Sequence, residues 1–317
     1  MNCFLNTSSP NLQLLNTRFA IDASRLSYLN SHQFHRNYNI SIPIFRRKIS
    51  IRRYTYFYPQ IRRTKAVSPP HAVVPGDGAF IQDAGATALV LGGGYAFVSV
   101  FEYLTQNNII PQKLSRKLVH ILSGLFFMVS WPLFSTSSTS RYFASLVPLA
   151  NGLKLLVYGL SLVTDEGLVK SVTREGKPEE LLRGPLYYVL ILALCAVVFW
   201  RDSPVGLISL SMMSGGDGVA DIMGRKFGTE KIPYNKKKSW AGSISMFAFG
   251  FLTSLGMLYY FSSLGYFQLN WVSTVKSVAV ISFLASVIES LPIGELIDDN
   301  LSVPLATMII AYMCFSL

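Results

Sequence analysis

The sequence predicts an all-α membrane protein, a polytopic bundle of about eight transmembrane helices. Only 14% of the residues are charged, 50% are hydrophobic, and the mean hydropathy is +0.37. A soluble domain, by contrast, carries about 25% charged residues. The apolar residues gather in runs close to the length of about 20 residues that crosses the hydrocarbon core of a bilayer. Short polar connections separate these runs, which favours one continuous helical domain.

The N-terminal residues 1–65 differ from the rest of the chain. They contain many Arg and Lys residues but a single acid, Asp22, and they are rich in Ser, Asn and Thr. This composition is typical of an organelle transit peptide, and the segment lacks the continuous apolar stretch of a secretory signal. A disordered basic arm lying on anionic lipid is the alternative. Aromatic residues between the cations could stack on RNA bases, but we expect no nucleic-acid partner.

Residues 66–83 predict a linker, because proline and glycine recur there, for example at Pro69, Pro70, Pro75 and Gly76. The membrane domain is then expected to occupy residues 84–317. The three cysteines of the chain are far apart in sequence, so their spacing indicates neither a zinc site nor a disulfide framework.

Eight apolar runs are the predicted spans. Two are the weakest: one is interrupted by Pro148, Asn151 and Lys154, and the other carries Asp217 and Asp221. The predicted spans are residues 84–104, 118–134, 142–160, 184–200, 205–223, 242–261, 272–291 and 302–317.

Alternation of these spans across the membrane predicts two very different faces. One face receives the connections 105–117, 161–183, 224–241 and 292–301, and the other receives 135–141, 201–204 and 262–271. The first set holds nearly every charged loop residue. The positive-inside tendency makes it the cytosolic or stromal face. An active site there could use all four connections, including Arg174 from the second.

Two carboxylates in the fifth run predict a metal site. Asp217 and Asp221 are four residues apart, so on a helix they share one face and could hold one Mg²⁺ ion together with substrate phosphates. The alternative is a helix cap at Asp217 and an ion pair between Asp221 and Arg225. The metal is favoured because glycines, which let the backbone approach a ligand, surround the first carboxylate: Gly215, Gly216 and Gly218.

Cations and hydroxyls follow this carboxylate pair. Lys238 and Ser239 stand directly before the next apolar run, where a helix N-terminus would bind phosphate. Arg225, Lys226 and Lys231 are further phosphate-binding candidates, although cations at a membrane boundary often only set topology or contact lipid head groups. Two more small residues belong to the expected phosphate cradle: Gly242 and Ser243.

Polar residues at other span ends could complete the site. Glu289 lies inside an apolar run, and Asp298, Asp299 and Asn300 stand before the last one, on the same predicted face. An acidic cluster in a short loop is usually only solvated. His120 begins a predicted span three residues after a lysine; it could orient a phosphate, accept a hydroxyl proton or simply bond a backbone carbonyl.

Several motifs together resemble those of the plant chloroplast phytol kinases, a group within the polyprenol kinase family that also includes farnesol and dolichol kinases. The similarity extends from about residue 84 to the C-terminus. The matching stretches are residues 114–121, 171–176, 215–228, 231–235, 238–243, 289–292 and 298–300.

The resemblance implies a chloroplast membrane enzyme that transfers the γ-phosphate of CTP, or another nucleoside triphosphate, to phytol. The product would be phytyl phosphate, formed in phytol salvage for tocopherol synthesis, and Mg²⁺ would be the cofactor. Asp217 and Asp221 would hold the metal, and the water-soluble donor and the lipid-dissolved alcohol would approach from different sides. The alternatives are a farnesol or geranylgeraniol kinase, a CTP-dependent lipid cytidylyltransferase, and a membrane transporter with a buried Asp pair.

Overall fold

The computed structural model describes residues 76–292 and 297–316. The predicted transit peptide and the first part of the predicted linker lie outside these residues. The first helix, α1 (Gly76–Gln106), begins before the expected residue 84, so residues 76–83 are helical rather than part of a linker. Asp83 gives a physical reason, because its carboxylate accepts hydrogen bonds from the Ser135 backbone N–H at 2.7 Å and the Ser135 hydroxyl at 2.9 Å.

The described residues are almost entirely helical, which confirms the all-α prediction. The exception is a small antiparallel hairpin of β1 (Lys231–Ile232) and β2 (Asn235–Ser239). Short turns are η1 (Trp131–Leu133), η2 (Pro178–Leu182) and the π-helical η3 (Met212–Asp217). The remaining helices are α2 (Gln112–Ser130), α3 (Ser140–Gly159), α4 (Glu166–Val172), α5 (Gly184–Val198), α6 (Pro204–Ser211), α7 (Gly218–Phe227), α8 (Trp240–Ser263), α9 (Trp271–Ser290) and α10 (Asp299–Ser316).

Four of these helical segments are long and apolar enough to cross a membrane by length and composition. They are Gly78–Gln106, Pro178–Val198, Trp240–Ser263 and Trp271–Ser290. The other predicted spans also coincide with helices, but they are shorter or carry charges, as α2 does at Lys113, Arg116 and Lys117. The fold is therefore an all-helical membrane bundle, and the number of eight crossings stays a prediction.

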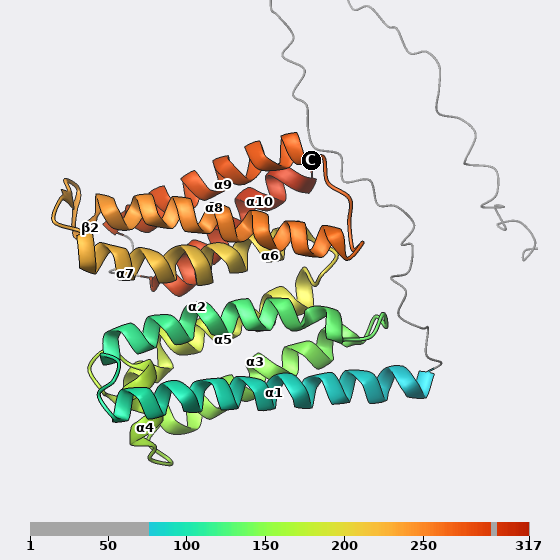
Figure 1. Cartoon of the computed structure of the whole chain (residues 1–317), viewed down its shortest axis with the longest axis horizontal. Helices are drawn as coiled ribbons and strands as arrows, with labels where there is room; N and C mark the ends of the chain where they lie inside the picture. The colour runs from blue at the N-terminus through green and yellow to red at the C-terminus, as the bar shows by residue number, and fades with distance from the viewer. Residues whose placement is uncertain (1–75, 293–296, 317) are drawn as a thin grey trace, which may run out of the picture. The chain divides into compact units, whose positions relative to one another are not determined.

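The helices form two groups that follow one another in the chain (Figure 1). In the first group, α3 packs against α5, and α1 packs against α2, α3 and α4. In the second, α8 packs against α7, η3 and α9, while α10 packs against α6 and α9. The groups meet where α2 contacts α6, η3 and α7, and where α5 contacts α6 and α10.

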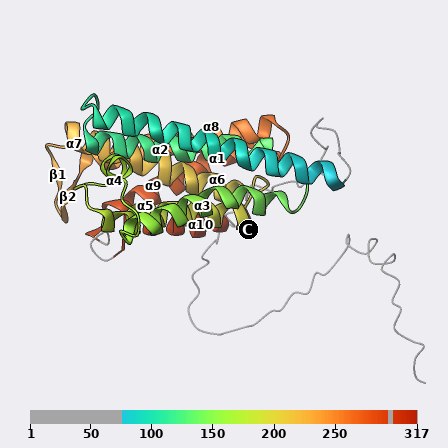
Figure 2. The same cartoon turned by 90° about the horizontal axis from the view of Figure 1, so that it is seen from below.

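Consecutive long helices run in opposite directions, so the connections gather at two ends of the bundle (Figures 1 and 2). The end that contains α4, β1 and β2 holds the described residues of the four polar connections, as alternation predicted. Hydrogen bonds join them across the bundle: the Gln112 side chain donates to the Thr173 carbonyl at 3.2 Å, and the Asn300 side chain donates to the Gly184 carbonyl at 3.1 Å.

The opposite end is closed by Arg201, which is only 4% exposed. Its guanidinium donates to the backbone carbonyls of Trp131, Phe134 and Ser135. These carbonyls follow the end of α2, where the helix provides no further donors. At this end of the bundle, the buried Arg201 guanidinium therefore provides the donors for the carbonyls at the C-terminal end of α2.

Candidate functional site

The fifth predicted span is interrupted by the π-helical turn η3, all six residues of which are buried. Such turns are frequent at functional sites. Here the turn is also tightly packed: a Cβ atom on Gly215 would lie 2.5 Å from Thr253 Oγ1, and one on Gly218 would lie 2.2 Å from Ile121. Gly216 faces the backbone of Gly250 on α8.

These glycines therefore permit close helix packing, as small residues do in membrane proteins. The expectation that Gly215, Gly216 and Gly218 cradle phosphates stays a prediction; in the structure, atoms of neighbouring helices lie where a side chain on each of them would begin.

Asp217 ends this turn and is 5% exposed. Its Oδ2 lies 2.9 Å from the ammonium of Lys117 and 3.8 Å from His120 Nε2, both on α2. A carboxylate so buried needs a cation to offset its desolvation. Lys117, itself 6% exposed, provides that charge.

Asp221 has different partners from Asp217. Its carboxylate lies 2.8 Å from the guanidinium of Arg225 and 3.6 Å from that of Arg116. The expected sharing of one metal by Asp217 and Asp221 stays a prediction. Side chains four residues apart do share a helix face, but here each carboxylate is neutralised by its own cation. The alternative ion pair with Arg225 is present, whereas the Asp217 side chain makes no helix cap.

The carboxylates that do converge with Asp217 come from two other helices. Glu289 lies near the end of α9 and Asp299 begins α10, and one oxygen of each lies within 4.8 Å of the others and of one Asp217 oxygen. The Lys238 ammonium, from β2, bonds to both Glu289 and Asp299, the latter at 2.8 Å. Burial lowers the pKa of Lys238, but the two carboxylates outweigh it, so its pKa lies above the ordinary value.

A cavity of ≈ 660 Å³ surrounds these groups, and we call it the polar pocket. Four carboxylates line it, those of Asp217, Asp221, Glu289 and Asp299. Its cations come from four separate segments of the chain: Lys117, Arg174, Arg225, Lys231, Lys237 and Lys238. The pocket can therefore hold a polyanion together with a divalent cation.

The N-terminus of α8 forms one wall of the polar pocket. Ser239 caps this helix by accepting a hydrogen bond from the Gly242 N–H at 3.2 Å, and both residues line the pocket. Ser243 lines it too and lies 3.5 Å from the Glu289 carboxylate. Gly242 is close to Gly224 of α7, so two helix ends meet here. A helix N-terminus pointing into a cationic pocket favours bound anions.

Three of the expected site residues lie elsewhere. Lys226 is exposed and stands over the Phe227 ring at 5.3 Å. Asp298 accepts a hydrogen bond from the Asn300 backbone N–H at 2.9 Å at the start of α10. Asn300 bonds to α5 rather than facing the polar pocket. The acidic triplet is therefore divided: one carboxylate enters the site, and its neighbours fix the helix start.

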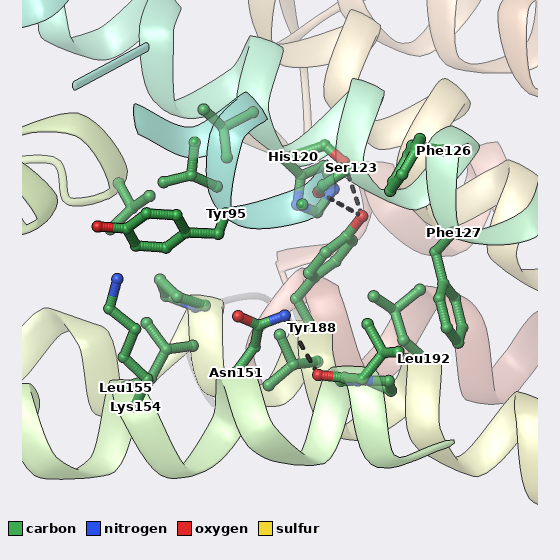
Figure 3. Close-up of a pocket in the computed structure, with 18 of the residues that line it drawn as sticks. Tyr95, His120, Ser123, Phe126, Phe127, Asn151, Lys154, Leu155, Tyr188 and Leu192 are labelled. Carbon is green, nitrogen blue, oxygen red and sulfur yellow. Dashed lines mark hydrogen bonds between the residues drawn. The ribbon is translucent and has the colours of Figure 1, made fainter. Parts of the chain in front are cut away.

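A second cavity, of ≈ 160 Å³, lies between α1, α2, α3 and α5, and we call it the apolar pocket (Figure 3). Its walls include Val119, Phe127, Val147, Leu155, Val189 and Leu192. Polar side chains reach it from α2, α3, α5 and the start of α10: Arg116, Lys117, His120, Ser123, Asn151, Lys154, Tyr188 and Asn300. Lys117 also lines the polar pocket, so this one side chain borders both cavities.

His120 is held in one orientation at this junction. Its Nε2 lies 2.9 Å from the Met213 carbonyl, and since a carbonyl only accepts, Nε2 must carry the hydrogen. A neutral imidazole in this tautomer keeps its lone pair on Nδ1. Figure 3 shows the Tyr188 ring beside His120, with its hydroxyl donating to the His120 carbonyl at 2.7 Å. The expected bond from His120 to a backbone carbonyl is thus present, and Nδ1 remains able to accept a proton.

The sequence interpretation missed Lys117 and Tyr188 as site residues. Lys117 had a signal, because it directly precedes a predicted apolar span and stands three residues before His120, on the same helical face. Tyr188 had none, since it stands in a wholly apolar run where an aromatic residue normally packs in the core.

The fold and the two pockets define a polytopic membrane protein with a charged ligand site at one end of the bundle and an apolar cavity beside it. Known proteins resemble the chain closely. Probable phytol kinase 1, chloroplastic, of Glycine max is 65% identical over 248 residues, which is 78% of this chain and 82% of the relative. Phytol kinase 1, chloroplastic, of Arabidopsis thaliana is 63% identical over 235 residues, 74% of this chain and 77% of the relative.

A Zea mays relative, probable phytol kinase, chloroplastic, is 56% identical over 258 residues, 81% of this chain and 82% of its own length. The chain belongs to the family of plant chloroplastic phytol kinases, and it is a chloroplast membrane protein. No family model matches the chain. No solved structure matches it either.

Proposed function

We propose that this protein phosphorylates phytol, using a nucleoside triphosphate held in the polar pocket and giving phytyl phosphate. Its relatives carry the name phytol kinase at high identity over most of the chain. The observation that supports the site most directly is that Lys117 borders both cavities. A transfer from a water-soluble donor to a lipid alcohol needs such a junction between a charged and an apolar compartment.

The polar pocket suits the donor in size and charge. Its volume of ≈ 660 Å³ lies within the range of about 300–1,000 Å³ typical of small-molecule sites. Arg174, Arg225 and Lys231 lie at its rim on the loop-rich end, where a triphosphate can enter from water. We propose CTP as the donor, as the resemblance to polyprenol kinases implies, and phytol salvage for tocopherol synthesis as the setting.

The residues present also suit Mg²⁺. Asp217, Glu289 and Asp299 offer hard oxygen ligands from three helices that converge within 4.8 Å, and Mg²⁺ is commonly held by one or two carboxylates plus substrate phosphates. When bound, the ion would neutralise charge on the transferring phosphoryl group. Lys238, which now neutralises two of these carboxylates, would then be available to the phosphates.

The groups at the junction can support the transfer itself. The alcohol oxygen forms a bond to the γ-phosphorus while the bond to the β–γ bridging oxygen breaks, so that a nucleoside diphosphate leaves. Lys117 and Lys238 stabilise the negative charge of the phosphoryl group. The hydroxyl proton passes to Nδ1 of His120, whose tautomer is fixed by the Met213 carbonyl. Replacing His120→Gln should lower kcat about 100-fold with the nucleotide KM unchanged, and a wild-type kcat would contradict this role.

The test of the function is an assay with membranes from an expressing host, phytol, and CTP labelled at the α or the γ position. Label from γ alone should reach the lipid. Label from α would indicate a cytidylyltransferase instead. Running the assay with ATP and UTP, and with farnesol and geranylgeraniol, determines the donor and acceptor preferences. Binding of Mn²⁺ in place of Mg²⁺, followed by its paramagnetic resonance signal, tests the metal site independently of turnover.

A further inference from the structure

We infer that the apolar pocket, which is open on one side, receives part of the hydrocarbon chain of the acceptor alcohol and thereby influences which chain lengths are accepted. This inference rests on the proposed phytol kinase function. It assigns a ligand to a cavity for which the sequence carries no motif, because apolar residues on helix faces are ordinarily interpreted as core.

The direction of the pocket fits a linear chain. Its lining residues on α2 extend from Arg116 to Phe127, a distance of about 17 Å at about 1.5 Å per residue. The cavity therefore runs along the helices, which is also the direction in which a lipid chain lies in a bilayer. Branched aliphatic and aromatic side chains form its deeper part, including Val147, Val189 and Leu192, and such walls suit the methyl branches of an isoprenoid.

The polar groups are concentrated at the end that meets the polar pocket. Lys117 and His120 line the cavity there, and Lys154 of α3 stands over the Tyr95 ring at 5.2 Å. Figure 3 shows Lys154 and Tyr95 on one side and Phe127 and Leu192 on the other. An alcohol placed with its chain among the apolar walls would thus present its hydroxyl to Lys117. The opposite placement would bury the hydroxyl among side chains such as Val147 and Leu192, which offer no hydrogen-bond partner.

The pocket also has a side that faces outward. Tyr95 of α1 and Phe126 of α2 line it, and they are 67% and 39% exposed. On the surface of a membrane bundle, exposed aromatic side chains contact lipid. The acceptor can therefore enter sideways between α1 and α2, without passing through water or through the polar pocket.

Gly94 offers a direct test of this assignment. It lines the apolar pocket, and a Cβ atom built on it would meet no heavy atom within 4 Å. Gly94→Phe should therefore place a bulky side chain in the cavity, and its first carbon meets no protein atom. Gly92, on the same helix, is the matched control: a Cβ atom there is equally free, but the residue is exposed and lies outside the pocket lining.

Both variants and the wild type should be assayed with C10, C15 and C20 prenyl alcohols at saturating nucleotide. In Gly94→Phe, the ratio of kcat/KM for C20 to that for C10 should fall at least about tenfold, with an unchanged KM for nucleotide. Gly92→Phe should keep the wild-type ratio. An unchanged ratio in Gly94→Phe, or an equal change in both variants, would overturn the inference.

Photolabelling of the wild type separates this inference from the proposed function. A prenyl alcohol with a diazirine at its chain end should label the apolar pocket on α1, α2, α3 or α5 with no nucleotide present, and excess phytol should suppress the labelling. Labelling of the apolar pocket without any phosphoryl transfer would contradict the proposed function but support the assignment of the pocket to the alcohol chain. Transfer with labelling confined to other helices would sink the pocket but keep the function.

Discussion

The two pockets are built from different halves of the chain. The polar pocket is formed mainly by the second group of helices, at the ends of α7, α8, α9 and α10 and along the hairpin, and ten charged side chains line it. The apolar pocket is formed mainly by the first group, from α1, α2, α3, α4 and α5, with Asn300 of α10 as the one lining residue from the second. They meet at Lys117, where α2 of the first group contacts α7 of the second.

This difference reflects the cost of charge in a membrane. Ionisable groups are expensive in hydrocarbon and are retained where they are paired or reach water, so the charged site lies at the loop-rich end. A cavity for a lipid chain needs only apolar walls, which the spans already provide. In the proposed function, nucleotide chemistry and lipid selection are divided between the two helix groups, which are joined by the ion pair of Lys117 with Asp217.

The largest expected effect concerns Asp217, the carboxylate at the junction. Asp217→Asn should reduce phosphoryl transfer about 1,000-fold, because it removes a charge from the convergent carboxylates and leaves Lys117 buried without its partner. Asp221→Asn is the matched control, since this carboxylate already pairs with Arg225 and Arg116. It should cost no more than about tenfold. Initial rates per amount of membrane-inserted protein measure both effects. Equal losses in the two variants would favour a metal held by Asp217 and Asp221 together.

Lys238 tests whether the polar pocket binds the nucleotide. Lys238→Met should lower kcat/KM for the nucleotide about 100-fold, because it removes the cation that bonds to Glu289 and Asp299. Lys236, exposed on the same strand and outside the pocket lining, is the control. Lys236→Met should change this parameter less than about twofold. A similar loss in both variants would indicate that the strand contributes only general positive charge.

Tyr188 addresses the apolar side. Tyr188→Phe keeps the ring against His120 but removes the hydrogen bond to the His120 carbonyl, so kcat/KM for the alcohol should fall about tenfold. The KM for nucleotide should not change, because Tyr188 does not line the polar pocket. Tyr187, its neighbour outside the apolar pocket lining, is the control in a Tyr187→Phe variant. A shift in the nucleotide KM would show that the two pockets are not functionally separate.

The smallest effect on transfer is expected at the far end of the bundle. Arg201→Met should leave the rate per folded protein within about twofold, but it should lower the free energy of unfolding by about 2–4 kcal/mol, because three backbone carbonyls lose their donor. Thermal unfolding in detergent measures this. Arg141→Met, which removes a single bond to the Val197 carbonyl, should destabilise less. Lost transfer in a folded Arg201 variant would mean that the far end communicates with the site.

Much of the site could be predicted because its residues follow local rules. Apolar runs of membrane length predict helices, and their alternation predicts which connections share an end. Charged residues at those ends are costly unless they bind something, which singled out Asp217, Lys238, Glu289 and Asp299. The membrane bundle, the shared polar end and most of the polar pocket lining were therefore present in the sequence pattern.

Only the tertiary structure decided which of these groups meet. Asp217 bonds to Lys117, which is 100 residues away in the chain, and no spacing rule connects two such positions. Asp221 is four residues from Asp217 and four residues from Arg225, so helix spacing fits a shared metal and an ion pair equally well. Only the folded chain shows that Arg116 and Arg225 reach its carboxylate.

The glycines around Asp217 and the apolar pocket were beyond sequence reasoning for a related reason. The sequence does not distinguish a glycine that lets a ligand approach from one that lets a helix pack closely. The structure shows neighbouring helices beside these glycines. Apolar helix faces likewise do not reveal whether a side chain or a lipid chain fills the space between them. The sequence by itself determines residue chemistry and helical periodicity. Which side chains from different helices meet, and where cavities remain between helices, is decided only when the helices pack.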